Sequence, residues 1–462
     1  MLSFAPFSFK YALVVSYTYL IYKLFKSKDN RNLNNLFLWS FGYWAIGTSW
    51  IIVSIYYYGN VSFGGSVSLF LILSIGCIIF FFLPILLLKR VINKSDNLLL
   101  LVPFVLILVE LGRYYFLGGF PWLLPGYIFL DTPYENLYGL IGVSGLSLLL
   151  YFFVTANVAL YSNKTFLLAF NSFLLISFMI PNIFENNISD EDVVNFAIIQ
   201  PSTDPFNKFD NDYLSDTEDE FISLSSQAAE IADILVWPEA PLPYTFESVR
   251  SQNLIKNLEK PLVSGFFSYQ EGNLYNSIIN SEQEIKYNKR KLVPFGEYIP
   301  FESFLRGLIS FFDMPMSNIT QGGAPQQMNV GYGNFSPLVC FDIVFGEMVR
   351  KDVKSSNYII NVSNDTWFGN SFGPYQHLEI SRIRSVENNI PIIRVTNDGI
   401  SALIDNKGTI VDYMGKGTSG ILHVKLLPTD VRTYYNQYGN LLLYLYLLVV
   451  SIKIFFVRMK NA

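Results

Sequence analysis

NFSPLVCFD, residues 334–342, is typical of a short buried β-strand with a cysteine at its end. Cys340 is one of only two cysteines in the chain. In α/β folds, chemistry is placed where the strands end. A buried cysteine on its own is most often a small core residue. The stretch therefore indicates an α/β domain and makes Cys340 a candidate nucleophile only if suitable partners exist.

Glu239 and Lys289 are the candidate partners of Cys340. Glu239 lies in VWPEAP, where two prolines stiffen the backbone just past a strand-like run. A carboxylate held beside an apolar wall can act as a general base. Lys289 precedes the apolar run LVPFGE (292–297), and a lysine packed there could stabilise an oxyanion. The ordinary alternatives are an exposed loop glutamate and a solvated basic run.

Three more residues are candidates for supporting roles. Glu297 could orient Lys289 or serve as a second acid. Asn364 and Trp367 lie in NVSNDTWFG (361–369), which follows another strand-like run and could line a pocket. A plain transition from strand to turn explains the Asn and Asp of this stretch equally well.

The region from about residue 190 to 430 has the pattern of an α/β domain. Short apolar runs alternate with polar stretches, and two polar stretches have helical length. The runs are 193–199, 234–237, 261–267, 338–341, 358–362, 392–395 and 400–404, and the helical segments are 217–232 and 375–388.

The rest of the chain has the composition of a membrane protein. Of 462 residues, 51% are hydrophobic and 15% are charged, against about 25% charged in soluble domains. A helix needs about 20 apolar residues to cross the hydrocarbon. The segments 5–25, 36–58, 66–88, 97–116, 138–161, 165–181 and 441–457 approach or meet that length.

Basic residues in the loops predict the orientation. Alternation of basic and non-basic loops places the N-terminus and the α/β domain outside and the C-terminus in the cytoplasm. The predicted organisation is a transmembrane bundle at 1–181, a domain at 182–435 and a last helix at 436–462. The basic residues counted are Lys23, Lys26, Lys28, Arg31, Lys89, Arg90, Lys94, Lys164, Lys453, Arg458 and Lys460.

One stretch of the bundle, 118–127, is too rich in Gly and Pro for a helix. GGFPWLLPGY is either a loop at the membrane interface, where its aromatic residues would fit, or a mouth for a lipid. Nearby, Glu110 and Arg113 end an apolar segment. Ionisable residues there indicate a functional site, although a snorkelling arginine is an equal alternative.

Composition also excludes several classes of function. The net charge of −5 shows no excess of basic residues of the kind that nucleic-acid-binding proteins carry. Two cysteines cannot build a disulfide framework, and two distant histidines do not suggest a metal centre. We expect no metal, no other cofactor and no nucleic-acid partner.

Together these motifs resemble the carbon–nitrogen hydrolase (nitrilase) superfamily, and with the membrane segments they resemble its apolipoprotein N-acyltransferase family. The resemblance covers nearly the whole chain, and the blocks LVPFGE and SNDTWFG are the most specific part of it. Further matching segments are Trp237-Pro238-Glu239, Tyr287-Asn288-Lys289, Val339-Cys340, Gln376-His377, Arg394-Val395-Thr396-Asn397-Asp398-Gly399 and Gly119-Phe120-Pro121-Trp122.

The resemblance implies an α-helical transmembrane bundle plus a nitrilase-like α-β-β-α sandwich. It implies that Glu239 is the general base, Lys289 the oxyanion stabiliser, Cys340 the nucleophile and Glu297 a further essential carboxylate. The implied reaction moves an acyl chain from a phospholipid, through a Cys thioester, to the α-amine of a diacylglyceryl apolipoprotein. A monomer in a bacterial inner membrane, with a periplasmic catalytic domain, is expected.

The chain departs from the family pattern in two places. Phe341 and Asp342 stand where the family typically has Tyr and Glu, so an aromatic ring and a carboxylate remain but the phenol hydroxyl does not. Seven apolar segments are counted, whereas the family usually has eight.

Three alternatives compete with the acyltransferase. A membrane-anchored amidase could use the same three residues on a small amide, but one anchor would then suffice. A transporter or scaffold with a degenerate domain would not need Glu239, Lys289 and Cys340 together. A papain-like pair of Cys340 and His377 lacks a surrounding protease signature.

Overall fold

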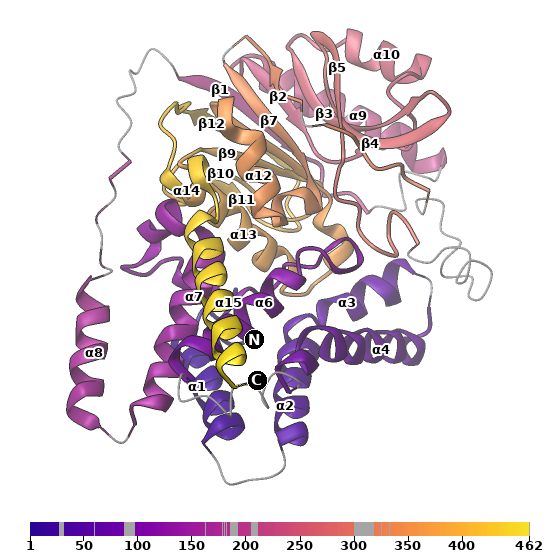
Figure 1. Cartoon of the computed structure of the whole chain (residues 1–462). Coiled ribbons are helices and arrows are strands. Elements are labelled where there is room, and N and C mark those ends of the chain that lie inside the picture. The colour runs from indigo at the N-terminus through magenta and orange to yellow at the C-terminus, as the bar shows by residue number, and fades with distance from the viewer. Residues whose placement is uncertain are drawn as a thin grey trace. The chain divides into compact units, whose positions relative to one another are not determined.

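The computed structural model describes residues 1–26, 32–59, 61–86, 98–161, 163–177, 179, 181, 183–184, 193–204, 211–299, 318–324, 326–331 and 333–461. The chain forms two compact units (Figure 1). A helical unit comprises Met1–Tyr56, Val61–Ile183 and Gln437–Ala462, and an α/β unit comprises Tyr57–Asn60 and Phe184–Asn436. The expected boundary at residue 182 lies outside the described residues, as do the basic loop residues Lys28, Arg31, Lys89, Arg90 and Lys94.

The helical unit is organised around α7, which packs against α1, α6 and α15. Within the described residues, Phe63–Leu86 and Glu135–Ala159 are long and apolar enough to cross a membrane, and a pair bent by 50° (Leu33–Ile46 and Trp50–Tyr57) is a third candidate. The helices are α1 (Tyr11–Phe25), α2 (Asn32–Phe41), α3 (Trp50–Val53), α4 (Phe63–Phe81), α6 (Leu98–Gly112), α7 (Tyr138–Ala159), α8 (Lys164–Ser177) and α15 (Leu441–Asn461).

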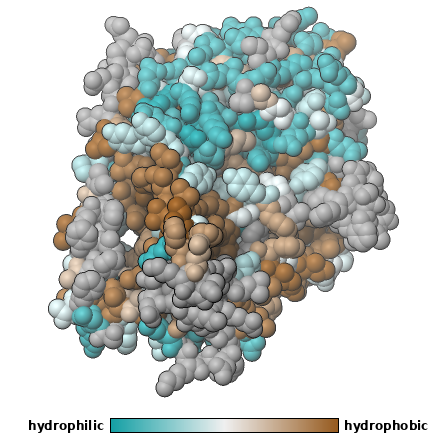
Figure 2. All heavy atoms as spheres, in the orientation of Figure 1, coloured by the Kyte–Doolittle hydropathy of each residue, from teal (hydrophilic) through white to brown (hydrophobic). Residues whose placement is uncertain are grey.

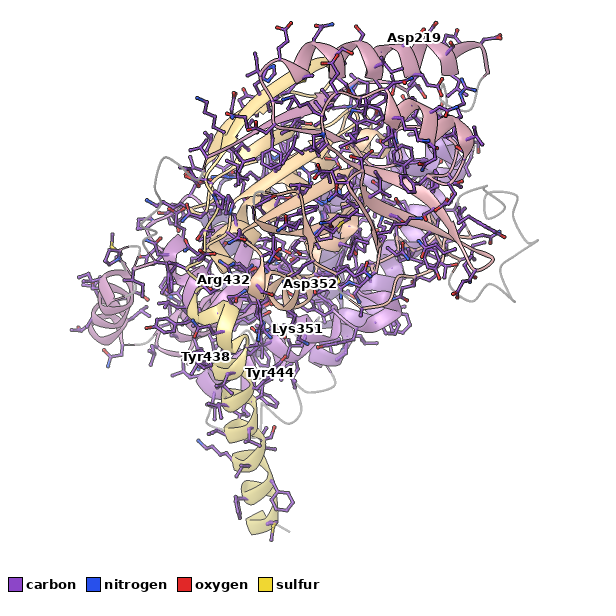
Figure 3. The ribbon with its side chains drawn as sticks, turned by 90° about the horizontal axis from the view of Figure 1, so that it is seen from above. Asp219, Lys351, Asp352, Arg432, Tyr438 and Tyr444 are labelled. Atoms are coloured by element: carbon purple, nitrogen blue, oxygen red, sulfur yellow. The ribbon has the colours of Figure 1, made fainter. Side chains whose placement is uncertain are left out.

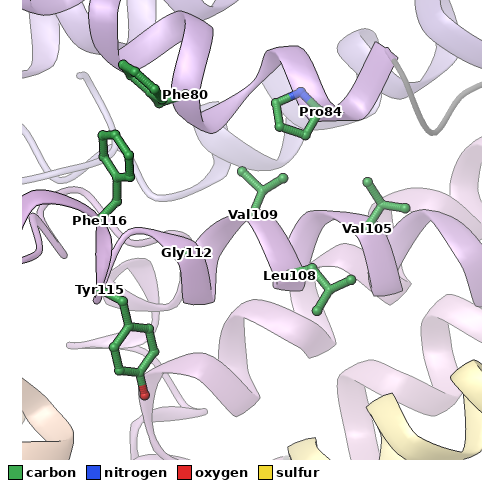
Figure 4. A pocket seen from close by; sticks show the side chains of 8 residues that line it. All are labelled: Phe80, Pro84, Val105, Leu108, Val109, Gly112, Tyr115 and Phe116. Atoms are coloured by element: carbon green, nitrogen blue, oxygen red, sulfur yellow. The ribbon is translucent and has the colours of Figure 1, made fainter.

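The surface of the helical unit is apolar. Leu442, Val449 and Phe455 on α15 are each more than 60% exposed, and brown surface gathers on this unit while the α/β unit is mostly teal (Figure 2). A groove of about 510 Å³ between α4 and α6 is also apolar, and Phe80 and Val109 are among its lining residues (Figure 4). Large exposed apolar surfaces mark interaction with lipid or protein, so the surface favours membrane embedding.

Residues 121–127 of the Gly- and Pro-rich stretch are buried inside the helical unit. Trp122 and Leu124 are 1% and 0% exposed, and Tyr138 donates its hydroxyl hydrogen to the Gly126 carbonyl at 2.6 Å. Trp122 is therefore packed within the protein, and the choice between an interfacial loop and a mouth for a lipid stays a prediction. Non-helical backbone in apolar surroundings needs polar partners, and neighbouring helices supply them.

Glu110 and Arg113 are also buried, at 1% and 3% exposure. Arg113 donates to the Trp122 carbonyl, and its guanidinium carbon lies 4.7 Å from the centre of the Trp44 ring. Tyr151 donates to Glu110 Oε2 at 3.1 Å. The snorkelling alternative is wrong, because Arg113 points inward and holds the buried stretch.

The α/β unit contains two six-stranded sheets, ordered β12-β1-β2-β3-β4-β5 and β11-β10-β9-β8-β7-β6. In Figure 1 the helices α9 and α10 lie beside the first sheet, and α12 and α13 lie beside the second. The strands are β1 (Val194–Gln200), β2 (Ile234–Trp237), β3 (Leu262–Gln270), β4 (Asn273–Asn280), β5 (Gln283–Asn288), β6 (Met328–Asn329), β7 (Asn334–Val339), β8 (Tyr358–Ser363), β9 (Ile392–Thr396), β10 (Ser401–Ile404), β11 (Ile410–Met414) and β12 (Gly420–Leu426); the helices are α9 (Asn211–Ala229), α10 (Val249–Lys256), α12 (Gly346–Asp352), α13 (Gly373–Asn388) and α14 (Tyr434–Tyr438).

Alternating side chains build the layers of this unit. On β1, Phe196 and Ile198 join a core that also contains Val339 and Ile360 of the second sheet. Their neighbours on β1 join a separate cluster with Phe221 of α9. Successive side chains of a strand point to opposite faces, so the first sheet packs on the second sheet with one face and on helices with the other. The expected α-β-β-α sandwich is confirmed.

Candidate active site

Four chain segments carry the candidate residues past the ends of strands that, within each sheet, run in the same direction. β1, β2 and β3 are parallel, and so are β7, β8 and β9. β5 is antiparallel to β4, which is antiparallel to β3, so β5 runs with β2. Glu239 follows β2, Lys289 follows β5, Cys340 follows β7 and Asn364 follows β8. Carboxyl ends of parallel strands form the usual site edge of an α/β fold.

The turn that carries Glu239 lies directly against β3, at Gly265. A Cβ on Gly265 would stand 2.6 Å from Glu239 Cα, closer than real contacts allow. The Gly265 N–H also donates to the Pro238 carbonyl at 3.1 Å. Gly265 therefore fixes the position of the Glu239 backbone by close approach.

The ammonium of Lys289 lies between two buried carboxylates. Its Nζ is 2.8 Å from Glu297 Oε1 and 3.3 Å from Glu239 Oε1. Asn276 donates from Nδ2 to the same two oxygens, at 3.1 Å and 2.7 Å respectively. Burial lowers the pKa of Lys289, but the charges of Glu239 and Glu297 outweigh it and leave the pKa well above its usual value. Lys289 is therefore a cation at neutral pH.

The remaining carboxylate oxygens accept backbone hydrogen bonds. The Asn364 N–H donates to Glu239 Oε2 at 2.8 Å, and the Val293 N–H donates to Glu297 Oε2 at 2.8 Å. Asn364 thus approaches Glu239 from the second sheet through its backbone. Both carboxylates are held on two sides, which fixes their orientation toward Lys289.

Cys340 follows β7 at a sharp turn. It opens the short 3₁₀ helix Cys340–Val344, and its φ of +46° lies in the left-handed region that side chains rarely adopt. The expected strand 338–341 therefore ends earlier, at Val339. Burial raises the pKa of the Cys340 thiol, Glu239 raises it further and Lys289 opposes the shift. The resting thiol keeps its proton and needs a base to become nucleophilic.

Asp342 ties the Cys340 segment to the Lys289 segment. It accepts hydrogen bonds from the Val339 N–H at 3.1 Å, the Lys291 N–H at 2.8 Å and the Tyr287 hydroxyl at 2.9 Å. Burial raises the pKa of Asp342 to about 6, against the charge of Lys289 and these hydrogen bonds. The hydrogen bonds of Asp342 therefore connect the end of β7 to the end of β5.

Two further contacts hold the same region. Phe341 is 8% exposed and packs edge-on against Phe345, with ring centres 5.1 Å apart. Arg290, the residue after Lys289, forms an ion pair with Asp352 at the end of α12, which is labelled in Figure 3. The backbone next to Lys289 is thereby anchored to a helix of the same unit.

The SNDTWFG block turns after β8 and places its members differently. Asn364 is 6% exposed and Trp367 is half-buried in the 3₁₀ helix Asp365–Phe368. Asp365 is fully buried and forms an ion pair with Arg394 at 2.5 Å. Burial opposes ionisation of Asp365, but the charge of Arg394 keeps its pKa below the usual range.

His377 on α13 completes this buried group. Its Nδ1 lies 3.0 Å from Asp365 Oδ1, and its Nε2 lies 3.3 Å from the backbone carbonyl oxygen of Cys340. Burial and the charge of Arg394 lower the pKa of His377. A papain-like imidazolium–thiolate pair is disfavoured, because the pKa of His377 is lowered while that of Cys340 is raised.

Residues 196–436 match the carbon–nitrogen hydrolase family, and residues 1–156 match the apolipoprotein N-acyltransferase N-terminal domain. The chain is 31% identical over 495 residues to the apolipoprotein N-acyltransferase of Haemophilus influenzae, which covers 99% of this chain and 94% of that protein. The chain belongs to the apolipoprotein N-acyltransferase family. It is an acyltransferase of the carbon–nitrogen hydrolase superfamily, and it is associated with a membrane.

Other similarities extend over a comparable or smaller length. The apolipoprotein N-acyltransferase of Pseudomonas syringae pv. tomato is 33% identical over 466 residues, or 94% of this chain and 90% of that protein. Among solved structures, a CN-hydrolase superfamily protein from Xanthomonas campestris covers 51% of this chain and 90% of its own, with 17% identity and a TM-score of 0.40.

Sequence reasoning missed several residues of this candidate site. Asn276 lies in the middle of β4 with no motif around it, and Gly265 lies in the middle of β3. Asp365 and Arg394 stood inside quoted motifs without a role of their own. The signal that could have found these two is a pair of opposite charges beside apolar strand runs, because a buried charge needs a partner.

Proposed function

We propose that this protein transfers an acyl chain from a phospholipid to the N-terminal α-amine of an S-diacylglyceryl-cysteine apolipoprotein. The observation that carries the proposal is the placement of Lys289 between Glu239 and Glu297 at the strand edge where Cys340 turns out of β7. The names of the relatives supply the acceptor class, and the apolar surface of the helical unit supports a lipid donor.

In the first half-reaction, Glu239 accepts the proton of the Cys340 thiol as sulfur attacks the ester carbonyl of the phospholipid. Lys289 stabilises the negative charge that develops on the carbonyl oxygen. The ester C–O bond then breaks, and the lysophospholipid oxygen takes the proton back from Glu239. A thioester on Cys340 remains, which is a reactive acyl store.

In the second half-reaction, the α-amine of the acceptor attacks the thioester carbonyl. Glu239 accepts a proton from the amine, and Lys289 again stabilises the oxyanion. The C–S bond breaks, the sulfur is reprotonated from Glu239, and the amide product leaves. Exclusion of water protects the thioester between the two steps.

The other residues of the site support these three. Glu297 orients Lys289, and Asp342 holds the strand ends together. Phe341 and Trp367 provide apolar surface beside the thiol and at the turn after β8, and Asn364 fixes Glu239 through its N–H. A cation held by two carboxylates keeps its place while charge develops nearby, which is the preorganisation that catalysis needs.

We propose the following placement for these parts. Residues 1–181 and 436–462 are the transmembrane part, and residues 182–435 form the catalytic domain on the periplasmic side of a bacterial inner membrane. The basic residues of the loops carry the orientation. We propose that the enzyme acts as a monomer.

A transfer assay tests the proposal. Purified protein in detergent is given a phospholipid with a deuterated acyl chain and a short diacylglyceryl-cysteine peptide, and the products are analysed by mass spectrometry. The expected product carries the deuterated chain on the α-amine, and a peptide with an acetylated α-amine gives none. Hydrolysis of small amides without any transfer would reject the proposal and favour a membrane-anchored amidase.

A further inference from the structure

A group of three buried side chains lies behind the carbonyl of Cys340. Asp365, His377 and Arg394 are 0%, 1% and 0% exposed. Arg394 Nη2 lies 2.5 Å from Asp365 Oδ2 and 3.0 Å from His377 Nδ1. Arg394 Nη1 donates to Asn361 Oδ1 at 2.7 Å. The charges are paired, so the group is a fixed support for whatever His377 contacts.

The contacts of His377 bear on the tautomer of its ring. A carbonyl oxygen only accepts hydrogen bonds, so the 3.3 Å contact with Cys340 is a hydrogen bond only when Nε2 carries hydrogen. Nδ1 has a donor and an acceptor beside it, because Arg394 Nη2 and Asp365 Oδ1 each lie 3.0 Å away. With hydrogen on Nε2, the neutral ring accepts from Arg394 at Nδ1. Burial and the charge of Arg394 favour the neutral ring, since both lower the pKa of His377.

Cys340 needs such a support because its backbone is strained. A non-glycine residue at a φ of +46° is held there by its surroundings rather than by its own preference. The carbonyl of Cys340 turns with this φ and its ψ, so a donor on that carbonyl restricts the direction of the thiol. Well-placed reacting atoms account for large rate factors.

We infer that His377 is a positioning residue. It holds the turn at Cys340 in place through a hydrogen bond from Nε2–H to the Cys340 carbonyl. Asp365 couples this support to the base, because the adjacent Asn364 N–H holds Glu239 Oε2 at 2.8 Å. One turn after β8 thus fixes both the carboxylate and the nucleophile.

Two substitutions of His377 test whether an N–H at the position of Nε2 is what holds Cys340. H377Q keeps an N–H near the position of Nε2, whereas H377N keeps an N–H near Nδ1 and cannot reach the Cys340 carbonyl. The first readout is the rate constant for alkylation of Cys340 by iodoacetamide. The protein also carries C77A, which removes the other cysteine of the chain. We expect H377N to react about tenfold to a hundredfold more slowly than H377Q, which stays within about threefold of wild type.

A second readout uses the acyl donor and rests on the proposed function. We expect H377N to lower kcat for thioester formation without a matching change in KM, and H377Q to restore it. If wild-type protein forms no thioester, the proposed function fails while the alkylation result still tests the role of His377. Equal rates in H377N and H377Q would overturn the inference.

The tautomer can be observed directly, whether or not a variant folds. The chain has two histidines, so ¹⁵N-histidine labelling gives two ring systems, and substitution of exposed His423 assigns them. We expect the His377 ring to carry hydrogen on Nε2 at pH 7. Hydrogen on Nδ1 alone would overturn the inference.

Discussion

Lys289 Nζ lies 2.8 Å from Glu297 Oε1, with side chains that are only 1% and 8% exposed. Glu239, the proposed base, is 3.3 Å from the same ammonium. Glu297 therefore shares the positive charge that Glu239 would otherwise hold alone. A base paired fully with a lysine is a poorer proton acceptor, because the cation stabilises its charged form.

Replacing Glu297 with Gln should slow acylation. E297Q leaves Lys289 with Glu239 alone, so the base is weakened and the ammonium shifts from its position. We expect the single-turnover rate of acyl-enzyme formation to fall about a hundredfold. E218Q is the matched control, since Glu218 pairs with the exposed Arg250, and it should change little. A rate for E297Q equal to wild type would contradict the role given to Glu297.

Replacing Asn276 with Asp should make the stability of the folded protein depend on pH. N276D adds a third carboxylate beside Glu239 and Glu297, which raises the pKa of the new acid in the folded state. Its penalty is absent below the unfolded pKa and grows as the pH rises through the folded pKa. Thermal unfolding should show a larger loss for N276D at pH 8 than at pH 5.

N276L serves as the comparison for that prediction. It removes the same two hydrogen bonds without adding an ionisable group. Its destabilisation relative to wild type should therefore be nearly the same at both pH values. A parallel pH response of N276D and N276L would show that Asn276 does not bridge the two carboxylates.

The ionisation of Asp342 should change stability with pH in the direction opposite to that of a salt-bridged acid. Its pKa is raised from 3.8 to about 6 by burial, so its protonated form is favoured in the folded protein. Its contribution to stability is full below the unfolded pKa and is lost as the pH rises through about 6. The change is on the order of 3 kcal/mol over that range.

D342N removes this ionisation and tests it. The stability advantage of wild type over D342N, measured by denaturant unfolding, should be greater at pH 4.5 than at pH 8. A difference that is constant, or that grows toward pH 8, would mean that Asp342 is ionised in the folded protein throughout.

Gly265 should tolerate no side chain. G265A puts a Cβ 2.6 Å from Glu239 Cα and 2.8 Å from the Pro238 oxygen, so the turn with Glu239 must move. We expect a loss of about 1–3 kcal/mol in stability and a larger loss of acylation rate. G415A is the control, because a Cβ there meets nothing within 4 Å. Full activity in G265A would contradict close packing behind the base.

The sequence was sufficient for the class of fold and for the family, because both depend on local signals. Strand-like runs and the blocks LVPFGE and SNDTWFG lie within a few residues of Lys289 and Asn364. Parallel strands then explain why Glu239, Lys289 and Cys340 come to one edge of the sheets. Their chemical roles stay predictions.

The remaining contacts depend on pairings that no single sequence reveals. Asn276 reaches Glu239 and Glu297 only because β3, β4 and β5 align in a particular register. His377 meets the Cys340 carbonyl across 37 positions of the chain. Arg113 was expected at the membrane surface as often as inside, because hydropathy does not distinguish a buried arginine with partners from a snorkelling one.

The covalent step on Cys340 is the central claim, and intact-mass analysis tests it most directly. Protein with a defined phospholipid is compared with C340A and with C77A, which lacks the other cysteine, in α4. The account predicts a gain of one acyl chain in wild type and C77A, removed by hydroxylamine and absent from C340A. An unmodified wild-type mass, or an adduct that persists in C340A, would contradict it.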